Sequence, residues 1–116
     1  MASPLQQNVA VLKTPMIIRL TPDTAPHLDD ADNFRAFKIV APKDMDRAAL
    51  ARALGTLGRL ADDDHAWIDE AALRALANRP NDKAWHDSAT AMIGYAQRAG
   101  FIDADTGAIR AHIERA

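Results

Sequence analysis

Residues 82–101 read DKAWHDSATAMIGYAQRAGF, and this stretch decides which fold the sequence predicts. Asp82 is suited to cap the start of a helix, and Gly100 to end it in a left-handed conformation with Phe101 folding back. Between them, apolar side chains recur at helical spacing, flanked by Ile93. This stripe consists of Trp85, Ala89, Met92, Ala96 and Ala99. The pattern predicts one long amphipathic helix that ends near Ala99.

A second helix is predicted to begin at Asp69, where the chain enters through an aromatic residue and Ile68. Asp69 is the N-cap, and Ile68 and Leu73 form the apolar pair of a hydrophobic staple. Pro80 disfavours helix in the residue before it, so this helix should end near Asn78.

Two further helices are predicted, one on each side of this pair. The first follows Asp44 as N-cap, with an apolar face formed by Leu50, Leu54, Leu57 and Ala61. The last is short, is capped near Asp105 or Thr106, and presents Ile109 and Ile113. Glycines within the first segment weaken its second half.

Strand signals are confined to the N-terminal third of the chain. The apolar run 16–20 is followed by Thr-Pro-Asp, which is typical of a strand and its turn. Residues 34–40 alternate, with Phe37 and Ile39 on one face and Lys38 on the other. The segment 22–33 is rich in Pro and Asp and is expected to be loop. We therefore predict an α+β fold, mainly α, with about four helices and two or three short N-terminal strands.

The length and composition bound the domain organisation. A chain of 116 residues is sized for one domain, expected at 16–116, preceded by a flexible or extended arm at 1–15. The absence of Cys excludes disulfides, zinc ribbons and thiol nucleophiles. No apolar run has the length of a membrane span, so we expect a cytoplasmic protein with no membrane partner. High Ala, Arg and Asp content suggests a bacterial origin.

The shortage of large apolar residues predicts self-association. Leu, Ile, Val and Phe make up only about a fifth of the chain, which leaves a modest core. The segment from Val9 to Leu20 is too apolar for a free tail, and an exposed strand edge there would pair with a second chain. We expect a homo-oligomer, most simply a dimer, in which this segment or Ala-rich helix faces supply the contact.

Acidic clusters raise the question of a metal site. Asp62, Asp63, Asp64 and His65 carry ligand types for a divalent cation, but no further ligands stand at a matching spacing, so a solvated loop is favoured. The segment from Asp103 to Glu114 resembles a calcium loop superficially, yet its sixth position is Ala108 where Gly is required. No metal and no cofactor are therefore predicted.

His65, His86 and Tyr95 are the candidate catalytic residues. His86 and Tyr95 fall on opposite edges of the apolar stripe of one helix, so they would meet only through a third group. A structural role is favoured for each histidine, and whether the protein is an enzyme stays open.

Two functions remain after these exclusions. We favour a non-catalytic oligomeric or accessory module that works by protein contact. The alternative is a small cofactor-free enzyme or small-molecule-binding protein with a pocket lined by Trp67, Trp85 and Met92, although both tryptophans read more simply as core. Nucleic-acid binding is not expected, because acidic residues outnumber basic ones from Arg59 onward, ten to seven, and the second helix of the possible helix-turn-helix offers only Lys83 and Arg98 against Asp82 and Asp87.

Overall fold

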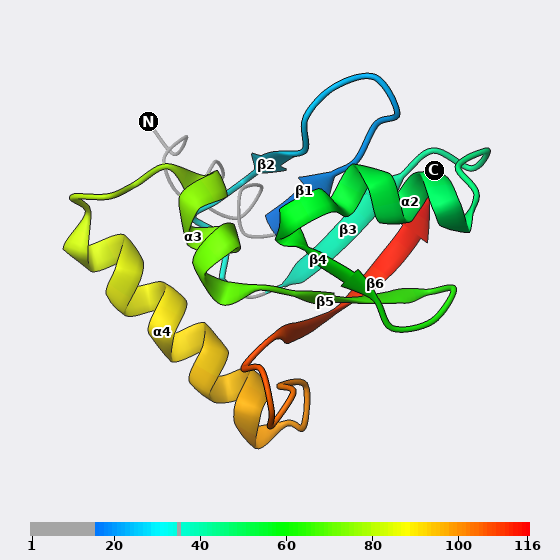
Figure 1. Cartoon of the computed structure of the whole chain (residues 1–116). Helices are drawn as coiled ribbons and strands as arrows, with labels where there is room; N and C mark the ends of the chain where they lie inside the picture. The colour runs from blue at the N-terminus through cyan, green and yellow to red at the C-terminus, as the bar shows by residue number, and fades with distance from the viewer. Residues whose placement is uncertain (1–15, 35) are drawn as a thin grey trace, which may run out of the picture.

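The computed structural model describes residues 16–34 and 36–116, which form a curled sheet of six strands with three α-helices (Figure 1). The strands are β1 (Met16–Arg19), β2 (His27–Asp29), β3 (Phe37–Ala41), β4 (Gly58–Leu60), β5 (His65–Ile68) and β6 (Ile109–Arg115). The helices are α2 (Arg47–Leu54), α3 (Glu70–Ala77) and α4 (Lys83–Arg98), and a 3₁₀ turn, η1 (Gly55–Leu57), follows α2. The predicted mainly α fold with two or three N-terminal strands is therefore wrong.

The strand order is β2-β1-β3-β6-β5-β4. β1, β3 and β6 run parallel to one another, whereas β2, β5 and β4 are each antiparallel to the strand beside them. β6, drawn in red, comes last along the chain yet lies between β3 and β5 (Figure 1). β6 therefore joins the group β2-β1-β3 on one side to the hairpin β5-β4 on the other.

The segment predicted to be the last helix is instead β6. Ile109, Ala111 and Ile113 are buried, and the residues between them are exposed. This is the two-residue period of a strand with one face covered. Ile109 and Ile113 alone fit a helix as well, because a spacing of four satisfies both periods. The buried alanine between them decides for a strand.

α2 is shorter than the helix predicted for that region. Its N-cap is Asp46, two residues after the predicted Asp44, and the Asp46 side chain accepts a hydrogen bond from the Ala49 backbone N–H at 2.8 Å. It ends at Gly55, whose φ of 53° is left-handed. Gly58 then lies in β4, where a Cβ would stand 1.9 Å from the Trp67 carbonyl oxygen. The prediction of helix as far as residue 61 is therefore wrong. Gly55 ends the helix, and Gly58 allows the following residues to pair closely with β5 as a strand.

Several predicted boundaries are confirmed. Asp69 caps α3 by accepting from the Ala72 N–H at 2.9 Å, and Asn78 ends that helix in the left-handed conformation. Asp82 and Gly100 bound α4 as predicted, with Gly100 at φ 86°. The run 16–20 contains β1, and the run 34–40 covers all of β3 except its last residue, Ala41. β2, β4 and β5 were not predicted, and β2 interrupts the segment expected to be loop.

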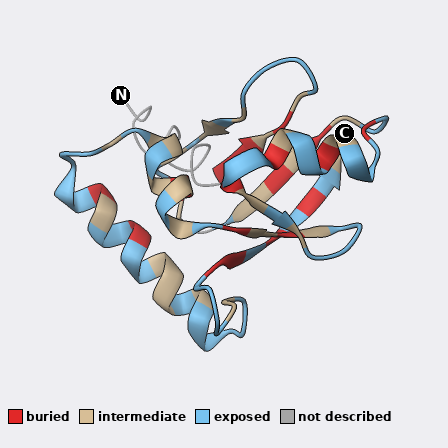
Figure 2. Cartoon of the chain, viewed as in Figure 1, coloured by how far each residue is buried: buried red, intermediate tan, exposed pale blue. Residues whose placement is uncertain are grey.

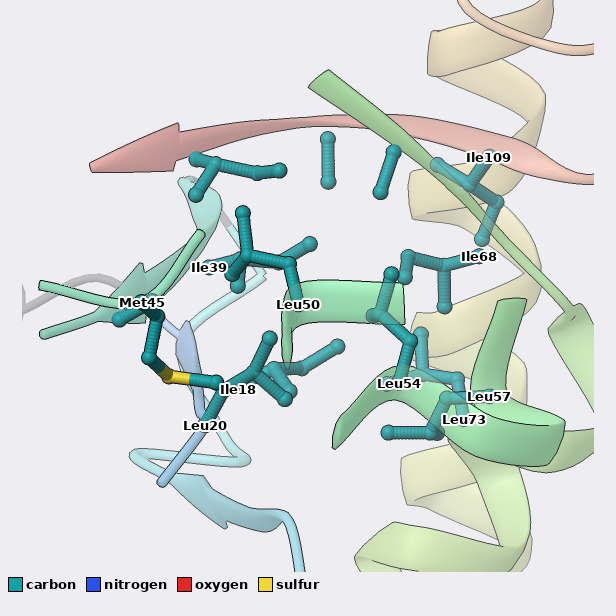
Figure 3. Packing of buried hydrophobic residues seen from close by; sticks show 14 residues of the cluster. Ile18, Leu20, Ile39, Met45, Leu50, Leu54, Leu57, Ile68, Leu73 and Ile109 are labelled. Carbon is teal, nitrogen blue, oxygen red and sulfur yellow. The ribbon is translucent and has the colours of Figure 1, made fainter. Parts of the chain in front are cut away.

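The core lies between α2 and one face of the sheet (Figures 2 and 3). Its fully buried large side chains are Met16, Ile18, Leu20, Ile39, Leu50, Leu54, Ile68 and Ile113. β1 thus supplies core residues and is hydrogen-bonded on both sides, to β2 and to β3. The prediction that residues 16–20 offer an exposed edge for dimerisation is therefore wrong. The predicted arm at 1–15, with Val9 to Leu12, lies outside the described residues.

The opposite face of the sheet carries the polar residues that matter for the site. The strand register places Lys38, His112 and His65 side by side on β3, β6 and β5. On the same face, the next row of β6 and β5 carries Arg110 opposite Trp67. Among the described helices, none is both long enough and apolar enough to span a membrane.

Candidate functional site

A cleft of about 330 Å³ opens between the second half of α4 and the neighbouring strands. We call it the α4 cleft. It is lined by Phe34, Ala36, Phe37, His65, Met92, Ile93, Tyr95, Ala96, Phe101, Ile109, Arg110 and His112. Its volume falls in the range of about 300–1,000 Å³ that small-molecule sites occupy, and most of its lining is apolar.

The first half of α4 is fixed to the rest of the domain by a buried tryptophan and by hydrogen bonds. Trp85 is buried, donates its indole Nε1–H to the Ala31 carbonyl at 2.8 Å, and packs against the Phe34 ring at 5.6 Å between centroids. Arg74 of α3 donates to Thr90 at 2.9 Å. Beyond these contacts α4 continues beside the sheet rather than across it (Figure 1). In its second half, Met92 and Ile93 pack partly against the core, and with Tyr95 and Ala96 they line the open side that forms the cleft.

Aromatic side chains form much of the apolar wall. Tyr95 is 67% exposed and Phe101 is 45% exposed, and both line the cleft with Phe34 and Phe37. The described part of the chain buries its other large apolar residues at least in part. Two large exposed rings at the same cleft are the kind of surface that marks a binding site rather than a scattered surface residue.

Polar residues converge at one end of the cleft. His65 and His112 stand directly opposite each other on β5 and β6, with ring centroids 5.5 Å apart and an edge-on arrangement. Arg110 lies two residues before His112, on the same face of β6. The cleft therefore combines a long apolar wall with a polar end that contains two imidazoles and one guanidinium.

Asp62 orients the His65 ring. Its Oδ1 lies 3.0 Å from Nδ1 of His65 and also accepts the Asp64 backbone N–H at 2.8 Å. These hydrogen bonds, from Asp64 and then from His65, hold the pKa of Asp62 below its ordinary value. An ionised carboxylate only accepts hydrogen bonds, so Nδ1 of His65 carries the proton and donates it. When the imidazole is neutral, Nε2 is the acceptor.

The turn that carries Asp62 is itself held in place. The Ala61 N–H donates to the His65 carbonyl at 2.9 Å, which closes the β4–β5 hairpin. The Ile113 N–H of β6 donates to the Asp64 carbonyl at 2.7 Å. Of the segment predicted to be a solvated loop, Asp62 to Asp64 are exposed, whereas His65 is partly buried and begins β5. The backbone of this segment is also tied to two strands. This fixed turn gives Asp62 and His65 a defined relative position.

Arg110 balances the charge of Asp62. A guanidinium nitrogen of Arg110 lies 3.8 Å from Oδ2 of Asp62, and the two side chains are partly exposed. With both imidazoles neutral, the polar end therefore carries one positive and one negative charge. It is suited to a polar neutral group more than to a permanently charged one.

The sequence candidates divide between the cleft and the rest of the molecule. His65 and Tyr95 line the same cleft, although the sequence offered no reason to bring them together. His86 lies elsewhere and is used structurally. Its Nε2–H donates to the Arg79 carbonyl at 2.7 Å, and its Nδ1 accepts from Arg74 at 2.9 Å.

The pocket predicted from Trp67, Trp85 and Met92 is not assembled as such. Met92 lines the α4 cleft, but Trp85 is only 4% exposed within the interior. Trp67 lies under the Arg59 guanidinium, 6.0 Å from the ring centroid. Arg110 and His112 were missed, because the segment was read as a helix. The sequence feature that could have revealed these two residues is the alternation of apolar and polar residues over 109–114, which is typical of a strand.

Neither acidic cluster forms a ligand set in the part of the chain that the structure describes. No group of three or more His, Cys, Asp or Glu side chains stands close enough there to hold a metal ion. Asp103 instead accepts the Asp105 backbone N–H at 2.9 Å and pairs with Arg59 at 3.0 Å. The calcium-like segment is thus a capped turn that leads into β6.

Comparisons of the chain with protein-family models, with curated proteins and with solved structures find no match. The α4 cleft and its polar end are therefore the basis of the function proposed below.

Proposed function

We propose that this protein binds a small, mainly apolar molecule in the α4 cleft. The observation that carries the proposal is the convergence of His65, His112 and Arg110 at one end of an otherwise apolar, largely aromatic cleft. Small-molecule sites combine these two elements, because the apolar wall supplies affinity and a few polar groups fix orientation.

The expected affinity is moderate. A ligand that buries roughly 200 Å² of apolar surface at about 25 cal/mol per Å² gains about 5 kcal/mol, which corresponds to a sub-millimolar Kd. The cleft is partly open to solvent and the ligand loses mobility when it binds, and both effects keep the affinity in this range. Binding is therefore expected to be measurable by NMR with simple neutral probes.

The test is an NMR titration with para-nitroanisole, an uncharged aromatic probe. We expect saturable shifts confined to the elements that line the cleft, namely the second half of α4 and the starts of β3, β5 and β6. Ala96→Trp should abolish them, since Ala96 lines the cleft and a larger side chain would fill it. Ala91→Trp is the matched control, because Ala91 lies on the same helix but is exposed outside the cleft. Equal binding by the two variants would refute the proposal.

Contact with another protein, including a second copy of this chain, is the second candidate. The exposure of Tyr95 and Phe101 supports it, since large exposed rings are enriched at protein interfaces. Light scattering after size exclusion should then give a mass above that of the monomer, reduced by Tyr95→Ala but not by Gln97→Ala, which changes an exposed polar neighbour. A monomeric mass for the unaltered chain at tens of micromolar would exclude self-association as this contact.

A cytoplasmic location remains part of the proposal and is supported by the lack of Cys.

A further inference from the structure

The polar end of the α4 cleft presents an acceptor to whatever enters. Nδ1 of His65 is occupied by Asp62 at 3.0 Å, so the ring nitrogen left for a ligand is Nε2. Within residues 16–34 and 36–116, no hydrogen bond is formed by this nitrogen. A neutral imidazole in this tautomer accepts at Nε2, and a matching ligand must therefore donate a hydrogen bond.

The surroundings of His65 specify the rest of that ligand. The cleft beside it is walled by four aromatic side chains, which favour an aromatic ring through offset or edge-on contacts. These side chains are Phe34, Phe37, Tyr95 and Phe101. A flat ring that carries one hydrogen-bond donor fits both parts of the cleft.

We propose that the α4 cleft binds a phenol, an aromatic ring with a hydroxyl group, whose O–H donates to Nε2 of His65. This assignment rests on the proposed function and names the ligand class for the same cleft. His65 is then the recognition residue, and Asp62 is a positioning residue that acts through it.

The need for a donor favours a phenol over a carboxylate. A carboxylate has lost its proton at neutral pH, so it has nothing to donate to Nε2. Arg110 would attract it and Asp62 would repel it, and because these two charges lie beside each other they do not compensate for the missing donor. A phenol brings its own donor and no charge. The remaining groups at this end are His112, Arg110 and, one strand away, Lys38, which is paired with Glu114 at 2.9 Å.

The same arrangement promotes partial proton transfer from the ligand. The proton moves from the phenol oxygen to Nε2 of His65, which leaves a phenolate and an imidazolium, and no other bond changes. Asp62 stabilises the imidazolium through Nδ1, and Arg110 stabilises the phenolate. The bound ligand should therefore be more ionised than the free ligand under the same conditions.

The experiment compares para-nitrophenol with para-nitroanisole, which has the same ring and no donor. We expect the phenol to bind roughly five- to tenfold more tightly, as one retained hydrogen bond implies. We also expect its phenolate absorption band to grow on binding, in neutral buffer, where an ordinary imidazole is mostly neutral and the free compound is only partly ionised. His65→Phe, which keeps a ring but has no acceptor, should remove both effects, and His27→Phe, which changes an exposed histidine outside the cleft, should remove neither.

Asp62→Asn separates positioning from folding. The amide keeps an acceptor for His65 and for the Asp64 N–H but lacks the charge, so binding should persist while the phenolate band weakens. Equal affinity for the two probes, or a preference for the phenol that survives His65→Phe, would overturn the inference and leave apolar binding intact. Failure of both probes to bind would overturn the proposed function itself.

Discussion

Leu50→Ala tests whether α2 closes the core over the sheet. Leu50 is 0% exposed and belongs to the cluster that contains Ile18, Ile39 and Ile113 (Figure 3). The substitution removes three carbon atoms, worth about 2.4 kcal/mol of transfer free energy at roughly 0.8 kcal/mol each. A sheet paired on both sides has little freedom to collapse into the cavity, so the total loss should be about 3–4 kcal/mol.

Urea unfolding followed by circular dichroism measures this loss of unfolding free energy. Leu76→Ala is the control, because Leu76 lies on α3 at intermediate exposure and should lose only about 1 kcal/mol. The expected result is a clear shift of the Leu50→Ala midpoint with an unchanged slope. A loss for Leu50→Ala below about 1 kcal/mol, or equal to that of the control, would show that α2 does not cover the core as described.

Three further predictions concern the backbone, a helix cap and acid stability. Gly58→Ala should lower the unfolding free energy by at least about 1–3 kcal/mol, because the new Cβ meets the Trp67 carbonyl; an unchanged melting temperature would contradict this. Asp69→Ala should cost about 1 kcal/mol by removing the cap of α3, and Asp69→Asn should restore most of it in urea unfolding. The hydrogen bond from Arg79 holds the pKa of Asp32 below its ordinary value, so this contribution is present above about pH 4 and is lost as pH falls through the folded-state value. Asp32→Asn should therefore show a smaller drop in stability on acidification than the unaltered chain, and an identical drop would refute the assignment.

Local chemistry allowed the helix ends to be predicted from the sequence. Asp69, Asn78 and Gly100 act through their own side chains or backbone freedom, so a pattern of a few residues contains the needed information. The strands β4 and β5 were missed for the converse reason. Each has only three or four residues. β4 pairs with β5 alone, and this short hairpin is held in the sheet through β6, which lies far along the chain. No local pattern specifies such a partner.

The candidate site was predictable by residue type and not by position. His65 and Tyr95 were singled out because imidazole and phenol groups carry chemistry, yet they meet only because β5 and α4 flank the same cleft. Arg110 and His112 were hidden by the helix assigned to 105–113. The cleft itself depends on how far α4 stands from the sheet, which is set by anchors such as Trp85 and Arg74.

The central position of β6 has a consequence for how the chain acquires its structure. Residues 16–41 and 58–68 contribute separate groups of strands, and these groups join only when 109–115 pairs with β3 on one side and β5 on the other. Until then, both inner strands expose unpaired backbone groups that can template pairing with neighbouring molecules. Assembly therefore waits for contacts between residues far apart in sequence, which slows folding and lengthens the time in which chains aggregate. Loss of the last seven-residue strand would leave two half-sheets rather than a smaller domain.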